Sequence, residues 1–261
     1  ASFIFAKDVY GNPYYFIEKQ LVFSVLGIVV LWLVGKVRLD FLIKNSFHIL
    51  IFFTVLLVLT QVPGIGVAAK GAKRWIAFGG LNLQPAEFTK YFLGPAAYYY
   101  FEHFERLELR DRIQYGLLLV LPLGIFLLQP DYGSFTICFL VVCFVCYMSS
   151  FPRKFFYSIL VSGIFLGIGL IFTAPYRLRR LLTFVDPWKN AKGSGFQIIQ
   201  SYLAFANGAI FGNGLGNGHE KLFYLPEAHN DFIFSVIGEE LGLVGVIGTI
   251  FLFVTFIFLG L

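Results

Sequence analysis

Residues 231–261 read DFIFSVIGEELGLVGVIGTIFLFVTFIFLGL, a stretch made almost entirely of apolar side chains. A helix needs about 20 predominantly apolar residues to cross the hydrocarbon core of a bilayer. This stretch is longer than that, so a helix here has length left to tilt or to protrude. Its apolar residues are continuous rather than alternating, which favours a helix over a membrane strand. The stretch therefore predicts a transmembrane helix.

The composition of the whole chain indicates that more such helices exist. The 261 residues are 58% hydrophobic, with a mean hydropathy of +0.77, and only 13% are charged. A soluble domain has about 25% charged residues, and a globule of this size cannot hide so much apolar surface from water. We predict an all-α polytopic membrane helix bundle with about seven spans, at residues 16–34, 47–62, 87–101, 113–128, 134–150, 154–174 and 231–261.

The loops between the spans alternate in character. Residues 63–86 and 175–230 are long and rich in Gly, Pro and polar side chains, whereas the other loops are short and denser in Lys and Arg. Cytoplasmic loops carry the excess of Lys and Arg, so we expect the two long loops to face outward. The chain begins in an outer loop and stops at the end of a span, which we interpret as a fragment of a larger membrane protein. The short basic loops are residues 35–45, 102–112 and 150–153.

Two classes of function fit the composition poorly. The net charge of +5 is spread along the chain without a run of Lys and Arg, so a nucleic-acid partner is not expected. Cys138, Cys143 and Cys146 lie in one apolar segment, where small packing residues are the simplest interpretation. Nothing pairs with them at the spacing of a disulfide framework or a zinc site.

Ionisable residues gather at the outward ends of the predicted spans. Such residues cost about 2.5–3.5 kcal/mol at the centre of a membrane helix, and they mark functional sites by default. In a bundle, the ends of different helices can converge on one site. The residues concerned, with the neighbouring Trp75, are Lys70, Lys73, Arg74, Glu87, Lys90, Asp131, Arg177, Arg179, Arg180, Asp186, Lys189, Glu227, His229 and Asp231.

Several of these residues have both a structural and a functional interpretation. Glu87 and Lys90 are three apart, so they share a helix face and can form an ion pair. The Arg177–Arg180 segment can reach lipid phosphates, or it can bind a phosphate or pyrophosphate of a ligand, which the geometry of Arg suits. Asp231 can cap the last span or act as a general base at the rim of a cavity.

Local sequence also predicts how some spans begin and where the chain turns. Residues 84–87 (QPAE) and 129–131 (QPD) open spans from the outer side, and Pro suits the first helical position while an acid suits the first turn. The glycine-rich residues 212–218 (GNGLGNG) lack the strand and helix of a dinucleotide site, so we expect a flexible or tightly turned loop.

Four groups of residues, in order along the chain, resemble the signatures of the SEDS family (shape, elongation, division and sporulation), which includes FtsW, RodA and SpoVE. Trp188 and two of the stretches are more similar to the FtsW and SpoVE branch than to RodA. The chain departs from the family at residues 204–211, AFANGAIF, where the family reads close to AIGSGGLF. The matching stretches are residues 71–76 (GAKRWI) with 83–87 (LQPAE), 129–134 (QPDYGS), 184–188 (FVDPW) with 195–201 (GFQIIQS), and 225–234 (LPEAHNDFIF) with 238–242 (GEELG).

The resemblance implies a truncated SEDS transmembrane domain over residues 1–261, taken from a protein of about ten spans. The implied activity is that of a peptidoglycan glycosyltransferase, which polymerises lipid II at the outer face of the bacterial cytoplasmic membrane in septal or sporulation cell-wall synthesis. Asp231 takes the place of the family's essential acid. The residues implied to bind substrate are Lys73, Arg74, Trp75, Glu87, Lys90, Asp131, Arg177, Arg180, Gln200, Ser201, Glu227 and His229.

The resemblance also implies partners. They are lipid II, a class B penicillin-binding protein, other proteins of the division or elongation complex, and membrane lipid. No tightly bound cofactor is expected, although a divalent cation, Mg²⁺ or Mn²⁺, can assist at the pyrophosphate. Two other functions stay open from the residues alone. One is a flippase or transporter of lipid II, because intramembrane charges and broken helices also suit transport. The other is a scaffold for a penicillin-binding protein.

Overall fold

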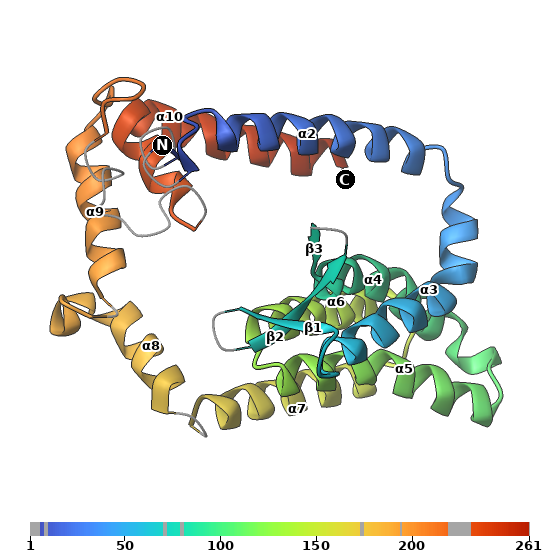
Figure 1. Ribbon diagram of the computed structural model, residues 1–261. Helices are drawn as coiled ribbons and strands as arrows, with labels where there is room; N and C mark the ends of the chain where they lie inside the picture. Colours follow the sequence, from blue (N-terminus) through green and yellow to red (C-terminus); the bar gives the residue numbers. More distant parts are fainter. Residues whose placement is uncertain are drawn as a thin grey trace. The chain divides into compact units, whose positions relative to one another are not determined.

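The computed structural model separates into two compact units, which are described one at a time (Figure 1). One unit comprises residues 32–169, and the other combines residues 1–31 with residues 170–261. Lys70, Glu227 and His229, which the sequence analysis placed at the outer face, lie outside the described residues. The residues that the structure describes are 6–7, 10–69, 72–78, 81–172, 175–193, 195–218 and 231–260.

Each of the seven predicted spans is a helix, and the chain is a polytopic helical membrane protein. Among the described residues, the helices long and apolar enough to cross a bilayer are α2, α3, α5, α7 and α10. The helix α6 is apolar but has 17 residues, and α4 carries more polar side chains. The bounds are α2 (Tyr15–Val34), α3 (Leu39–Leu59), α4 (Pro85–His103), α5 (Leu109–Leu128), α6 (Tyr132–Met148), α7 (Arg153–Phe172) and α10 (Ile233–Gly260).

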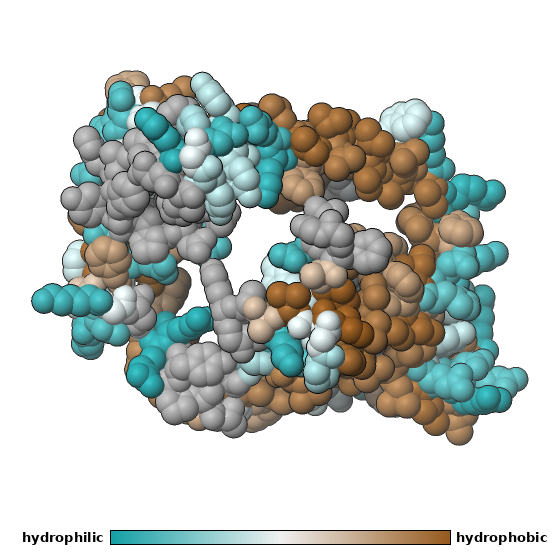
Figure 2. Space-filling model, viewed as in Figure 1, coloured by the Kyte–Doolittle hydropathy of each residue, from teal (hydrophilic) through white to brown (hydrophobic). Residues whose placement is uncertain are grey.

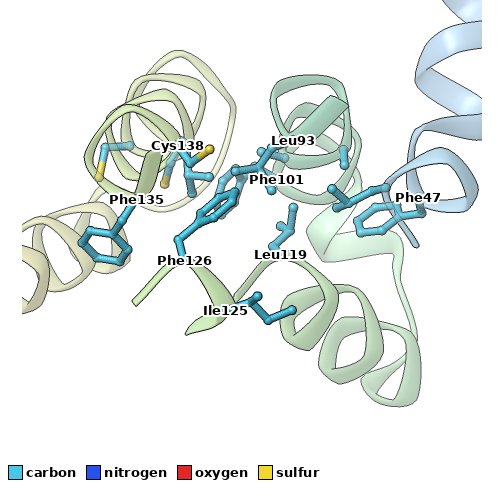
Figure 3. Packing of buried hydrophobic residues seen from close by; sticks show 14 of the residues in the cluster. Phe47, Leu93, Phe101, Leu119, Ile125, Phe126, Phe135 and Cys138 are labelled. Carbon is cyan, nitrogen blue, oxygen red and sulfur yellow. The ribbon is translucent and has the colours of Figure 1, made fainter. Parts of the chain in front are cut away.

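The core of the unit 32–169 lies among α3, α4, α5 and α6. Leu50, Leu93 and Phe126 are completely buried there, and Figure 3 shows Leu93 and Phe126 among the packed side chains. Cys138, Cys143 and Cys146 are buried and unpaired by disulfides, which confirms their predicted packing role. Figure 2 shows hydrophobic residues over much of the visible face, and hydrophilic residues at the end where α3 and α5 begin.

A small antiparallel sheet occupies the first long loop, and the sequence analysis did not predict it. Its strands are β1 (Gly66–Ala69), β2 (Ala72–Phe78) and β3 (Leu81–Leu83), in the order β1-β2-β3. Ile76 pairs with Gly66 on one side and with Leu83 on the other. A short 3₁₀ helix, η1 (Phe104–Arg106), follows α4.

The described part of the second long loop also contains helices. It contains α8 (Pro175–Val185), the 3₁₀ helix η2 (Pro187–Asn190) and α9 (Phe196–Gly208). The helix α9 packs against α10, and the two backbones come close because Gly208 faces Gly238. A Cβ atom on Gly208 would collide with the Gly238 carbonyl oxygen. Small residues at this contact therefore set the distance between the two helices.

The helix α10 is broken at Gly242, whose φ of 66° and ψ of −163° are not helical. The segment that follows α9 supplies partners for the backbone groups that the break exposes. Asn213 and Gly214 N–H donate to the carbonyls of Glu239 and Glu240, both at 3.0 Å. Leu243 and Val244 N–H donate in turn to the carbonyls of Ala209 and Ile210, at 2.9 and 3.2 Å. The glycine-rich residues 212–218 thus form a tight turn, one of the two predicted alternatives.

The departure from the family sequence falls beside this break. Ala209 has φ 45° and ψ −135°, a conformation that favours glycine. The family reads Gly at this position. This strained conformation allows the Ala209 carbonyl to accept the hydrogen bond from Leu243 N–H.

Replacing Gly242 by Ala should destabilise the protein by at least about 2 kcal/mol, because the new Cβ requires a strained backbone at positive φ. It would also collide with the Gly212 nitrogen and the Ile210 carbonyl oxygen. Thermal unfolding in detergent measures the loss. The control is Gly248→Ala in the same helix, where a Cβ meets no atom within 4 Å. Equal unfolding temperatures for the two variants would contradict the account of the break.

Candidate functional site

Arg74 of β2 binds the turn between α5 and α6. Its Nε donates to the carbonyl of Gln129 at 3.1 Å, and its Nη2 donates to the carbonyl of Pro130 at 2.6 Å. Its Nη1 lies 4.0 Å from Oδ1 of Asp131. Three consecutive residues of the turn therefore hold one guanidinium, and this arrangement ties the sheet to the helix bundle.

Asp131 caps α6. Its Oδ1 accepts from the Ser134 N–H at 3.2 Å, and its Oδ2 accepts from the Ser134 hydroxyl at 2.9 Å. The carboxylate is mostly buried. The sequence analysis expected Pro130 at the first helical position and Asp131 in the first turn, and this was wrong by two residues. Asp131 is the N-cap, because its carboxylate accepts a hydrogen bond from the Ser134 N–H, a first-turn amide that has no partner within the helix. At α4, Pro85 does begin the helix as predicted.

Gln129 anchors the other side of the same turn. Its Nε2 donates to the carbonyl of Leu57 at 3.1 Å and to the hydroxyl of Thr60 at 2.9 Å, both at the end of α3. Its Oε1 is buried and accepts no hydrogen bond from any described residue. The sequence analysis quoted Gln129 within a family motif but gave it no role of its own. The sequence feature that could have indicated this anchoring role is a glutamine at the end of an apolar span.

The remaining predicted residues of this unit lie on β2 and α4. Lys73 and Trp75 are placed on the strand face opposite Arg74, because successive side chains of a strand alternate. Lys73 is exposed, and Trp75 is half-buried. Glu87 and Lys90 form the expected ion pair, with Oε1 and Nζ 2.7 Å apart. The structure therefore brings Arg74 and Asp131 together, and it pairs Glu87 with Lys90.

In the other unit, Asp231 lies two residues before α10 and is exposed. Since α10 begins at Ile233, Asp231 is not at the capping position, and no described residue forms a hydrogen bond or ion pair with its carboxylate. The structural interpretation as a helix cap is therefore wrong for the described part of the chain. The carboxylate is accessible to a ligand.

The predicted residues of α8 and α9 differ in accessibility. Ser201 is buried, and its hydroxyl lies 2.6 Å from that of Ser235 on α10, so this hydroxyl joins two helices. Gln200 is half-buried. Arg179 and Arg180 are exposed on α8. Arg177 lies in the same helix, but its side chain is outside the described atoms.

Two buried acids precede the break in α10, and the sequence analysis assigned them no role. Glu239 is completely buried, and Glu240 nearly so. The Oε2 of Glu240 accepts from the Gly216 N–H at 2.9 Å, which ties the glycine-rich turn to the helix. Adjacent glutamates inside an apolar stretch were the signal that could have singled them out.

The described residues do not form a metal site made of protein ligands alone. Within the described ranges, no three side chains of His, Cys, Asp or Glu lie close enough to hold an ion. The expected divalent cation therefore has no complete set of described protein ligands.

Comparison with known proteins shows similarity over the whole chain. The family model FTSW_RODA_SPOVE, described as cell cycle protein, matches residues 1–261. "Probable peptidoglycan glycosyltransferase FtsW" of Nitrosococcus halophilus is 37% identical over 99% of this chain and 67% of its own length. The protein of the same name from Aliivibrio salmonicida is 39% identical over 94% of this chain and 62% of its own length. The chain thus spans about two thirds of these relatives.

Solved structures show the same fold. A chain from "Structural coordination of polymerization and crosslinking by a peptidoglycan synthase complex" matches with a TM-score of 0.65 and 26% identity. The match covers 89% of this chain and 65% of that chain. The rod shape determining protein RodA of Thermus thermophilus matches with a TM-score of 0.57 and 24% identity, over 88% of this chain and 60% of its own.

Replacing Arg74 by Gln should free the sheet from the α5–α6 turn. A hydrogen bond that involves a charged group contributes about 1.5–3 kcal/mol, so hydrogen exchange of the β2 and β3 amides should become at least tenfold faster. Hydrogen–deuterium exchange with mass spectrometry measures this rate. The control is Lys73→Gln, which changes the exposed neighbour of Arg74. In this variant the β2 and β3 amides should exchange at the wild-type rate. Unchanged exchange in Arg74→Gln would show that the guanidinium does not hold the sheet.

Proposed function

Since this chain belongs to the FtsW, RodA and SpoVE family of cell cycle proteins, we propose that the whole protein is a peptidoglycan glycosyltransferase. It polymerises lipid II, a disaccharide-pentapeptide on undecaprenyl pyrophosphate, into glycan strands. Support comes from the names of its relatives and from the accessible carboxylate of Asp231. That carboxylate is the single observation on which the mechanism rests.

The reaction needs one base and an anion that can leave. Asp231 takes the proton from the 4-hydroxyl of the acceptor sugar, and the resulting oxygen attacks the anomeric carbon of the lipid-linked donor. The new bond joins that oxygen to the anomeric carbon, and the bond from the anomeric carbon to the pyrophosphate breaks. Undecaprenyl pyrophosphate leaves with the bonding electrons. General base catalysis of this kind contributes about 10²–10⁴-fold to the rate.

Cations can stabilise the pyrophosphate as negative charge develops on it. Lys73 and Arg179 are exposed and are more available for this role than Arg74, whose donors already bind two carbonyls. Arg74 then acts by fixing the sheet that carries Lys73. A divalent cation would neutralise charge on the pyrophosphate, but the described residues offer no complete set of ligands for it and no step above depends on it.

The location and partners follow from the same proposal. The reaction takes place at the outer face of the bacterial cytoplasmic membrane, which is where the positive-inside rule places the long loops. The similar chain belongs to a peptidoglycan synthase complex that coordinates polymerization and crosslinking, which supports a class B penicillin-binding protein as the partner that cross-links the strands.

A lipid II flippase is the second candidate, and one observation favours it. Transporter sites are commonly built where membrane helices are interrupted, and α10 is broken next to the buried Glu239 and Glu240. This reading predicts movement of lipid II without polymer. It also predicts that replacing Glu239 or Glu240 reduces the movement of lipid II more than replacing Asp231 does.

Replacing Asp231 by Asn should lower polymerisation at least about 100-fold, because the amide cannot accept the proton of the acceptor hydroxyl. The measurement is glycan length from labelled lipid II, with the purified full-length protein and its partner. Asp40→Asn is the matched control, because Asp40 is an exposed acid of the short basic loop 35–45, where it pairs with Arg38 at 3.5 Å. It should keep wild-type activity.

Equal polymer from the wild type and from a folded Asp231→Asn variant would remove Asp231 from the mechanism. If neither variant makes polymer while a control polymerase does, and lipid II crosses vesicle membranes, the flippase is favoured.

A further inference from the structure

A cavity of about 570 Å³ lies within the unit 32–169, among α4, α5, α6 and α7. Its volume is in the range of small-molecule sites. Aromatic and aliphatic side chains form most of its wall, among them Phe101, Leu119, Phe139 and Phe151. None of the residues proposed to act in glycosyl transfer lines it, so it is a separate site.

The helix α7 contacts α6 closely at Gly163, where the Phe139 ring leaves no room for a Cβ atom, but α7 buries few of its own side chains. Phe156 is the one buried residue among the described residues of this helix. Small residues, including Ser158 and Ser162, face the cavity from α7. Their hydroxyls donate to the carbonyls of Lys154 and Ser158, at 3.0 and 2.6 Å, so they do not need a polar ligand. The wall is therefore suited to a hydrocarbon chain.

The cavity opens to the outside of the bundle between α5 and α7. Val120 of α5 and Leu166 of α7 both line it, and both are largely exposed. Both helices are long and apolar enough to cross a bilayer, so the opening faces membrane lipid rather than water. A lipid chain can enter it sideways.

Two cations lie at the end of the cavity that is nearest the short basic loops. The Arg112 guanidinium carbon lies 4.7 Å from the centre of the Phe104 ring, and Lys154 Nζ lies 5.1 Å from the centre of the Phe155 ring. Both rings line the cavity. Arg112 is fixed there, because its Nε and Nη2 donate to the carbonyls of Leu107 and Glu105 at 2.9 and 3.0 Å, while its Nη1 forms no hydrogen bond with a described residue and can bind an anion.

The adjacent loop, residues 102–112, carries four acids, including Asp111, against three arginines, so its formal charge is slightly negative. Glu102 is occupied by the Ser150 backbone and hydroxyl, both at 3.4 Å. Glu105 and Glu108 are exposed. Attraction for an anion therefore depends on the two cations beside the cavity rings.

We propose that this cavity binds one membrane phospholipid from the leaflet next to the short basic loops. An acyl chain fills the apolar cavity, and the phosphate lies between Arg112 and Lys154. Basic groups beside a pocket between transmembrane helices are a known arrangement for lipid head groups. Such a lipid supports α7, which has little packing of its own.

The test is native mass spectrometry of the full-length protein after extensive delipidation in detergent. The wild type should retain about one phospholipid per protein chain. Ser162→Phe, which fills the cavity from an exposed position, should retain at least tenfold less. Val161→Phe is the control, because Val161 is exposed on the same helix but does not line the cavity. It should retain as much as the wild type.

A second variant tests the phosphate contact. Lys154→Gln should weaken binding of added phosphatidylglycerol about fivefold, as expected for the loss of one basic residue near a lipid surface. The control is Lys36→Gln, since Lys36 lies 3.2 Å from the centre of the Trp32 ring, and neither residue lines the cavity. Its affinity should not change.

Equal retention by Ser162→Phe and Val161→Phe would overturn the proposal, as would equal affinity in Lys154→Gln and Lys36→Gln. A wild type that retains no phospholipid, because another segment of the full-length chain occupies the cavity, would overturn it as well. None of these outcomes depends on polymerisation of lipid II.

Discussion

Backbone N–H and C=O groups inside an apolar environment need partners within the protein, and this requirement governs the structure at its irregular points. At the break in α10, four backbone hydrogen bonds from residues 209–214 supply those partners. At the turn before α6, the carbonyls of Gln129 and Pro130 accept from Arg74. Within the regular spans, the backbone groups form hydrogen bonds with one another. Where a helix ends or is broken, the neighbouring loop supplies the missing hydrogen-bond partners.

The same requirement separates polar residues into two groups. Arg74, Asp131 and Ser201 are occupied by backbone, cap and helix–helix contacts. Asp231 and Lys73 are exposed, the first two residues before α10 and the second on β2. A proton-accepting carboxylate on a rigid support is what general base catalysis needs. In the proposed reaction, Arg74, Asp131 and Ser201 therefore hold the structural elements in position. Asp231 and Lys73 contact the substrate.

Much of this could be predicted from the sequence, and the exceptions have physical causes. The helices of the seven spans follow from continuous apolar runs, and the Glu87–Lys90 pair follows from helical spacing. The three-stranded sheet was missed because its strands are short and contain Ala and Gly, which carry little strand preference. The break at Gly242 was missed because a glycine in an apolar helix looks the same whether or not the helix continues. Tertiary hydrogen bonds decide that question, and they join residues about 30 apart.

The most direct measurement is a structure of the full-length protein with a non-reactive lipid II analogue bound as acceptor. The account predicts a carboxylate oxygen of Asp231 within about 2.6–3.2 Å of the acceptor 4-hydroxyl, the distance a general base needs. It also predicts exposed cations near the donor pyrophosphate. An acceptor bound with its 4-hydroxyl near another acid, and with Asp231 turned toward water, would contradict the central claim.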